Sequence, residues 1–289
     1  MIYVIGGPTG SGKTALAIAL AKSWNAPLIN ADAFQMYQEL NIGTNKELDL
    51  MKPLKPYLFD ELSPKSSLSV ATYQLRFREL INQLSKQHDR IIMVGGTGLY
   101  IKASLYDFEF APQLGKFDES KYDGLNNLQL HQYLANLDVE ASQKIHFQNR
   151  RRVLRAINIL ETTGKTKSDQ EKLQSKTLLY PATFIGILPQ RTSLYAQLEH
   201  RVDIMFKEGL LQEVENLVQK YGSNLQAFQA IGYKETIAYL QEKKSLEQTI
   251  QEIKQSTKRY AKRQITYFSH QLPMKWYSHW KDAFEELTR

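Results

Sequence analysis

The fold is decided by a short stretch near the start of the sequence, Gly7-Pro8-Thr9-Gly10-Ser11-Gly12-Lys13-Thr14. It has the form Gly-x-x-x-x-Gly-Lys-Thr, which is the pattern of a Walker A phosphate-binding loop. The apolar run Met1–Ile5 before it is typical of a buried strand, and Thr14–Trp24 after it has helical spacing. Glycines let the backbone wrap around an anion, and the helix N-terminus adds positive potential. We therefore predict that this loop binds a di- or triphosphate.

Strand and helix signals alternate along the first hundred residues. Pro27–Asn30 and Arg90–Val94 are predicted as buried strands, and Ser69–Lys86 is predicted as an amphipathic helix between them. This order predicts an α/β fold, a P-loop NTPase-like parallel sheet flanked by helices. Ligands of such sheets bind at the carboxyl ends of the strands, where the glycine loop, Asp32 and Thr97 all fall.

The pattern changes between about 111 and 180, where the sequence becomes helical, polar and basic. A core strand is predicted to return at Thr183–Leu188. The remaining segments have helical spacing, namely Ser193–Phe206, Leu210–Tyr221, Gly232–Gln241 and Leu246–His270. We predict a core made of residues 1–110 and 181–289, which includes the C-terminal helices, interrupted by a helical insertion at 111–180.

Composition narrows the class of protein. The 289 residues include no cysteine, which excludes disulfides, thiolate zinc sites and cysteine nucleophiles. There is no apolar run of about 18 residues and no signal peptide, so we expect a cytoplasmic protein without a membrane span. The formal net charge of +7 is compatible with an anionic partner but does not identify one.

The glycine loop alone does not choose a reaction. The strand Arg90–Val94 ends in glycines where a Walker B strand would carry aspartate, and no guanine-specifying Asn-Lys-x-Asp occurs. Asp32 follows a strand, and its position fits a helix N-cap, a magnesium ligand or a general base equally well. The glycine turn around Thr97 can serve packing alone, and a helical arginine such as Arg201 more often forms an ion pair than a ligand contact.

The sequence resembles tRNA dimethylallyltransferases along nearly its whole length. The shared motifs follow in the family's order: Gly7–Thr14, Asp32-x-x-Gln35-x-Tyr37, Asn41–Lys46, Gly95–Tyr100, Asn149–Ala156, Arg201–Leu210, Gln229–Glu235 and Arg259–Gln264. Two positions depart from the family, which usually has Ser at position 33 and Met or Arg at position 34, where this chain has Ala33 and Phe34. The resemblance implies transfer of a dimethylallyl group from dimethylallyl diphosphate to N6 of adenosine 37 in the tRNA anticodon loop, with Mg²⁺ as cofactor.

The resemblance also implies residue roles. Asp32 would be the general base at the N6 amine, with Thr97 near the target nucleotide and Arg201 as a second clamp on the diphosphate. The diphosphate cradle would comprise Gly7, Pro8, Thr9, Gly10, Ser11, Gly12, Lys13 and Thr14, with the Thr14 hydroxyl on Mg²⁺. Contacts to the tRNA anticodon stem-loop would come from Asp32, Ala33, Phe34, Gln35, Thr97, Arg151, Arg152 and Arg155.

Charge along the last long helix adds to the expected RNA surface. Lys254, Lys258 and Lys262 recur at every fourth position, with Arg259 and Arg263 beside them. Taken alone, such a stripe slightly favours a solvated helix face. A second basic segment at Lys144–Arg155 and the net positive charge favour RNA. We therefore add Lys258, Lys262 and Arg263 to the predicted tRNA contacts.

Three other functions stay open at this point. A P-loop small-molecule kinase would consume ATP and need no RNA, and an adenine-nucleotide prenyltransferase would modify free nucleotides. An RNA-binding protein with a vestigial loop would bind tRNA without chemistry, although the intact Lys13, Thr14 and Asp32 argue against it. We expect a monomer.

Overall fold

The computed structural model describes residues 1–112, 114–172, 174 and 177–289. It divides into two compact units, one formed by Met1–Leu105 with Leu178–Arg289 and the other by Tyr106–Thr177. The insertion predicted at 111–180 overlaps the second unit, whose bounds lie a few residues earlier. Positions 113, 173, 175 and 176 of the predicted insertion lie outside the described residues.

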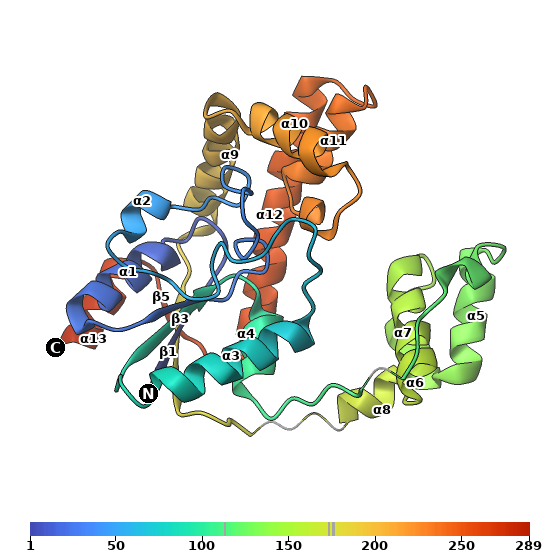
Figure 1. Ribbon diagram of the computed structural model, residues 1–289, viewed down its shortest axis with the longest axis horizontal. Helices are drawn as coiled ribbons and strands as arrows, with labels where there is room; N and C mark the ends of the chain where they lie inside the picture. The colour runs from blue at the N-terminus through green and yellow to red at the C-terminus, as the bar shows by residue number, and fades with distance from the viewer. Residues whose placement is uncertain (113, 173, 175–176) are drawn as a thin grey trace. The chain divides into compact units, whose positions relative to one another are not determined.

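The first unit is built on a five-stranded sheet (Figure 1). Its order is β2 (Leu28–Asn30), β3 (Ile91–Gly95), β1 (Ile2–Gly6), β4 (Ala182–Ile187) and β5 (Lys275–Tyr277). All neighbouring strands are parallel, which confirms the predicted α/β fold with a parallel sheet. The central strands are apolar at nearly every position because helices cover both of their faces.

Helices make up most of the rest of the first unit. They are α1 (Lys13–Trp24), α2 (Leu48–Met51), α3 (Val70–Leu84), α4 (Gly98–Leu105), α9 (Arg191–Lys207), α10 (Leu210–Tyr221), the short η2 (Gln226–Gln229), α11 (Tyr233–Leu240), α12 (Leu246–Gln271) and α13 (Trp280–Thr288). One core cluster joins Leu16 and Leu20 of α1 to Ile5 and Ile92 of the sheet. Ala283 of α13 completes this cluster, so the end of the chain covers α1.

Local signals explain where the long helices begin. The Ser69 hydroxyl accepts a hydrogen bond from the Thr72 N–H and caps α3. Ser245 and Gln248 form a capping box at the start of α12. None of the helices in the described ranges is long and apolar enough to cross a membrane.

The second unit is a small helical bundle. It contains η1 (Glu119–Tyr122), α5 (Asn127–Leu137), α6 (Val139–Lys144), α7 (Arg150–Thr163) and α8 (Lys167–Lys172). Leu130 and Leu134 of α5 pack against Val153 and Ile157 of α7, and all four are fully buried. The unit therefore has an apolar core of its own, which leaves the opposite face of α7 for exposed charge.

Candidate active site

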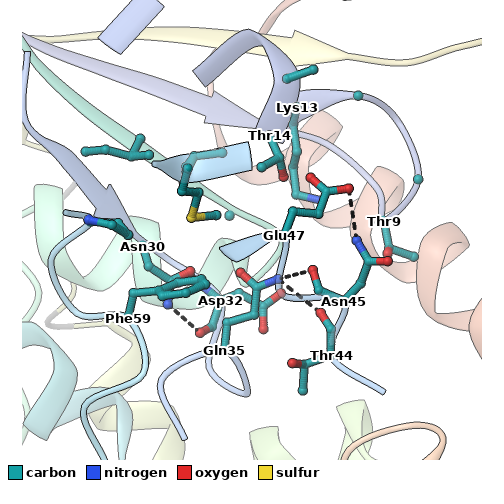
Figure 2. Close-up of a pocket in the computed structure, with 18 of the residues that line it drawn as sticks. Thr9, Lys13, Thr14, Asn30, Asp32, Gln35, Thr44, Asn45, Glu47 and Phe59 are labelled. Carbon is teal, nitrogen blue, oxygen red and sulfur yellow. Dashed lines mark hydrogen bonds between the residues drawn. The ribbon is translucent and has the colours of Figure 1, made fainter. Parts of the chain in front are cut away.

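A cavity of about 300 Å³ lies where the strands of the sheet end. Figure 2 shows side chains from the glycine loop, from β2 and from the following segment converging on it. Of the predicted site residues, the cavity is lined by Thr9, Gly10, Gly12, Lys13, Thr14, Asp32, Gln35 and Arg201. Asn45 and Glu47 also line it; Asn45 belongs to the motif Asn41–Lys46 but had no predicted role, and no pattern in the sequence selects Glu47.

The glycine loop has the backbone shape of an anion cradle. Gly7, Gly10 and Gly12 have φ values of 146°, 75° and 90°, in a region that side-chain-bearing residues rarely adopt. The loop leads straight into α1, whose free N–H groups point toward the cavity end of the helix. The Lys13 ammonium donates to the Pro8 carbonyl at 3.2 Å, and burial lowers the pKa of Lys13 to about 8.

Arg201 reaches this loop from α9, far along the chain. Its Nη1 donates to the Thr9 hydroxyl at 2.6 Å. Burial lowers the pKa of Arg201 to about 10, and the nearby Glu47 and Asp32 carboxylates oppose that shift. Its Nε is buried and finds no hydrogen-bond partner among the described residues. Arg201 is thus a cavity residue with unused donor capacity, where the sequence taken alone favoured a surface ion pair.

Asp32 lies two residues after the end of β2, and its carboxylate caps its own turn. Asp32 Oδ1 accepts a hydrogen bond from the Phe34 N–H at 3.1 Å. The Thr97 hydroxyl accepts the Ala33 N–H at 3.2 Å, so Thr97 holds the same turn from the end of β3. Asp32 lines the cavity, whereas Thr97 and Ala33 are not among its lining residues.

A second cavity of about 260 Å³ adjoins the first. The two share Thr9, Asp32, Thr44 and Arg201. The second is mainly apolar and is lined by Leu198, Val202, Met205, Ala230, Ile231 and Ile253, with Phe34, Tyr260 and Arg263 also present. Asp32 and Arg201 therefore stand where two ligands of different character could meet.

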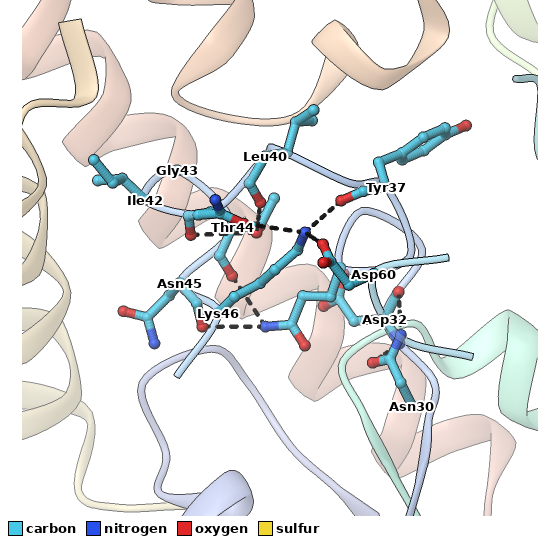
Figure 3. Close-up of polar contacts among 12 residues, drawn as sticks. Asn30, Asp32, Tyr37, Leu40, Ile42, Gly43, Thr44, Asn45, Lys46 and Asp60 are labelled. Atoms are coloured by element: carbon cyan, nitrogen blue, oxygen red, sulfur yellow. Dashed lines mark hydrogen bonds and ion pairs between the residues drawn. The ribbon is translucent and has the colours of Figure 1, made fainter. Parts of the chain in front are cut away.

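The segment 41–47 forms a wall of the first cavity, and Figure 3 shows how it is held. The side chain of Lys46 is completely buried, and its ammonium contacts the Tyr37 carbonyl and the Asp60 carboxylate. Gln35 Nε2 donates to the carbonyls of Thr44 and Asn45 at 3.0 and 3.3 Å. Gln35, predicted as a tRNA contact, thus also supports this wall. In the sequence, the motif Asn41–Lys46 was the feature that pointed to this wall, but no role was predicted for the residues of the motif.

The predicted arginines of the insertion lie together on α7. Arg151, Arg152 and Arg155 are exposed. Arg151 and Arg155 line a surface groove of about 760 Å³ with Phe117. Arg150 has a different role, because its guanidinium donates to the Leu125 and Tyr122 carbonyls at 2.7 and 2.6 Å.

The residues of the predicted basic stripe on α12 differ in their surroundings: two lysines are paired with acidic residues, and the later cations are exposed. Lys258 and Lys254 pair with Glu199 and Asp203 of α9 at 2.5 and 2.7 Å, which offsets much of their charge. Lys262 and Arg263 are exposed, and the Arg263 guanidinium lies 5.6 Å from the centre of the Tyr260 ring. The free positive charge is therefore concentrated in the second half of the helix.

The oxygen donors in the first cavity suit a magnesium ion. The Thr14 hydroxyl and the carboxylates of Asp32 and Glu47 all line it. Within the described ranges, no group of three or more His, Cys, Asp or Glu side chains forms a cage for a metal. Mg²⁺ typically uses one or two protein oxygens together with substrate phosphates and water, so the donor set fits an ion that arrives with a diphosphate.

A family model and two similar proteins identify the same family for this chain. Residues 35–271 match the family model described as IPP transferase. The chain is 40% identical over 284 residues to a tRNA dimethylallyltransferase of Bacillus cytotoxicus, covering 96% of this chain and 89% of that protein. It is 41% identical to the tRNA dimethylallyltransferase of Bacillus subtilis, covering 96% and 90%.

Solved structures agree with these relatives. A tRNA delta(2)-isopentenylpyrophosphate transferase from Staphylococcus epidermidis superposes with a TM-score of 0.74 at 36% identity, covering 99% of this chain and 97% of that one. A eukaryotic dimethylallyltransferase, described as acting on tRNA, superposes with a TM-score of 0.80 at 26% identity. That match covers 95% of this chain and 73% of the eukaryotic chain.

Proposed function

The chain belongs to the IPP transferase family and is a tRNA dimethylallyltransferase, and on this premise we propose which groups carry the reaction. Its donor is dimethylallyl diphosphate, and its acceptor is N6 of adenosine 37 in the anticodon loop of tRNA. The observation that carries the proposal is the meeting of Asp32 and Arg201 at the border of two cavities, one polar beside the glycine loop and one mainly apolar.

The donor's diphosphate occupies the glycine loop. Backbone N–H groups of the loop and the ammonium of Lys13 supply positive potential there. The unused Nε of Arg201, whose Nη1 donates to Thr9 of the loop, adds a further donor. These groups stabilise the negative charge that grows on the diphosphate as the C1–O bond of the donor breaks. The dimethylallyl C1 then faces the border between the two cavities.

Asp32 acts on the acceptor. The adenine N6 amine is a weak nucleophile because its lone pair is delocalised into the ring. It attacks C1 of the dimethylallyl group, the diphosphate leaves, and the Asp32 carboxylate takes the N6 proton. The hydrogen bonds that Thr97 and Phe34 make to this turn hold the carboxylate in place, so Thr97 is proposed as a positioning residue.

Magnesium is proposed as the cofactor, held by the Thr14 hydroxyl with help from the carboxylate of Glu47. Bound with the diphosphate, the ion would neutralise part of the leaving group's charge. Glu47 is close enough to Lys13 and Arg201 to affect the pKa of both, and this proximity supports a role for its carboxylate beside the predicted phosphate site.

The RNA is bound by exposed cations and by aromatic or apolar groups. In this proposal the adenine leaves its stack and enters the second cavity, at a cost of about a few kcal/mol. Arg151, Arg152 and Arg155 of the insertion contact the RNA backbone, as do Lys262 and Arg263 of α12. Lys258 contributes less than its spacing suggests, because Glu199 already pairs with it.

The experiment is transfer of radiolabel from dimethylallyl diphosphate to an anticodon stem-loop RNA. We expect Asp32→Asn, which keeps the size of the side chain but removes its basicity, to lower turnover by about 10²–10⁴-fold. Asp89→Asn is the matched control, since Asp89 is exposed and precedes β3, whereas the site lies where that strand ends. Wild-type turnover by Asp32→Asn would refute the base assignment, and RNA-independent ATP consumption would favour a kinase.

A further inference from the structure

Gln264 of α12 joins the two loops that carry the reaction. Its side chain is buried, with 4% of the residue exposed. Gln264 Oε1 accepts the Thr9 N–H of the glycine loop at 2.9 Å, and Gln264 Nε2 donates to the Gly96 carbonyl at 2.9 Å. One amide thus uses both of its ends on backbone atoms of two different loops.

Hydrogen bonds also connect each of these two loops to a residue of the proposed reaction, Arg201 for the glycine loop and Asp32 for the turn at Gly96. Thr9 receives the hydrogen bond of Arg201 through its hydroxyl. On the other side, the Thr97 N–H donates to the Ala31 carbonyl at 3.2 Å, and the Thr97 hydroxyl accepts the Ala33 N–H. Asp32 lies in the sequence between Ala31 and Ala33, the two residues to which Thr97 is hydrogen-bonded. Gln264 therefore closes a continuous hydrogen-bonded path from the diphosphate cradle to the turn that carries Asp32.

The glycines of the second turn are explained by the same helix. A Cβ on Gly96 would lie 2.1 Å from Gln264 Nε2, and a Cβ on Gly98 would lie 2.3 Å from the ring of Tyr267. Neither glycine has a positive φ, so the backbone alone would accept alanine at both positions. The requirement for glycine comes from α12, which packs directly on this turn.

We propose that Gln264 is a positioning residue that sets the separation between the diphosphate cradle and the Asp32 carboxylate. This rests on the roles proposed above for Asp32 and the glycine loop. Transfer requires the donor C1, the N6 amine and the carboxylate to be aligned at once, and a displacement of about 1 Å can lower a rate about 100-fold. Gln264 lines neither of the two cavities proposed for the reactants, so we expect its effect to fall on the rate of the chemical step more than on binding.

The test compares Gln264→Met with the wild type in single-turnover transfer, with both donor and stem-loop RNA saturating. Methionine keeps the volume of the buried side chain and removes both hydrogen bonds. We expect the rate constant to fall about 10- to 100-fold, while the dissociation constants of donor and RNA change less than about threefold. Gln271→Met is the control, because Gln271 lies on the exposed end of α12 and bonds to Lys102.

A second variant separates positioning from loss of folding. Gly96→Ala places a methyl group where the Gln264 amide lies, so it displaces the amide without altering residue 264. We expect its rate to fall like that of Gln264→Met, and we expect the double variant to be no slower than either single one, since both remove the same link. If Gln264→Met does not fold, Gly96→Ala carries the test alone.

Two outcomes overturn the inference. One is an unchanged single-turnover rate in folded Gln264→Met, or in folded Gly96→Ala if only that variant is available. The other is multiplicative rate reductions in the double variant, which would mean that the two residues act separately. The general-base proposal fails on a different result, namely full turnover by Asp32→Asn. That result would not change the measured effect of Gln264→Met on the rate.

Discussion

At the scale of single residues, the lowered pKa of Lys13 has a direct consequence for donor binding. Burial lowers that pKa to about 8, so the ammonium is charged below this pH and becomes neutral above it. The second ionisation of a phosphate group lies near pH 6, so the donor itself does not change charge above pH 8. Between these two ionisations, near pH 7, we expect the affinity for dimethylallyl diphosphate to change little, and above pH 8 we expect it to fall up to about tenfold per pH unit.

Lys13→Arg provides the comparison, because the guanidinium keeps its charge at every pH in this range. Calorimetric titration of donor at pH 7, 8 and 9 measures the effect. We expect the arginine variant to bind more weakly at pH 7 but to show no further decrease in affinity by pH 9. An equal alkaline decrease in both proteins would mean that another group titrates.

Single residues also show where sequence reasoning stops. The loop Gly7–Thr14 could be predicted because its chemistry is contained in eight consecutive positions. Arg201 and Gln264 could not be selected from local pattern alone, because each meets the loop only through the tertiary packing of its helix. The family resemblance supplied Arg201, and it included Gln264 in the motif Arg259–Gln264 without giving this residue a role.

At the scale of elements, α10 and α11 hold the segment 41–47, a wall of the first cavity, through Glu213. Its carboxylate accepts the N–H groups of Asn41 and Ile42 at 3.1 and 2.9 Å, and it also accepts the Tyr233 hydroxyl. A Cβ on Gly43 would lie 2.3 Å from the Tyr233 ring, so the segment and the helix are in direct contact. The motifs Asn41–Lys46 and Gln229–Glu235 are therefore two sides of one contact.

We expect Glu213→Gln to weaken this contact, because the amide presents one acceptor oxygen where the carboxylate presents two. The segment 41–47 should then exchange its amide hydrogens faster, and the KM for the donor should rise several-fold. Removal of such hydrogen bonds destabilises a protein by about 1–3 kcal/mol. Hydrogen-exchange mass spectrometry and steady-state kinetics measure both effects. Glu215→Gln on the same helix is the control, and equal exchange in the two variants would contradict this role for Glu213.

Elements were predictable in proportion to their length and periodicity. The long helices α10 and α12 and the apolar strands could be located, since each has many positions that repeat one pattern. The edge strand β5 was missed because it has only three residues, one of them an exposed lysine. The stripe on α12 was located, but its pairing with α9 was not, because ion pairs between helices depend on packing that periodicity does not encode.

At the scale of the whole molecule, binding of RNA should depend on charge in both units. Removing one cation that neutralises a phosphate of single-stranded RNA lowers the slope of log affinity against log salt by about 0.7. We expect the double variant Arg151→Ala with Arg155→Ala to bind the stem-loop more weakly, with a slope reduced by about 1.4. Filter binding between low and moderate salt measures it. Lys165→Ala, an exposed cation of the same unit, should change the slope less, and an unchanged slope in the double variant would remove this face from the RNA interface.

The whole molecule is proposed to carry a five-carbon prenyl group from a diphosphate in the glycine loop to an adenine presented by RNA. The most direct measurement is mass spectrometry of nucleosides from an anticodon stem-loop incubated with the protein, Mg²⁺ and dimethylallyl diphosphate. We expect N6-dimethylallyladenosine at position 37 with the wild type and almost none with Asp32→Asn. The proposal is contradicted if the wild type leaves that adenosine unmodified, or if Asp32→Asn modifies it at the wild-type rate.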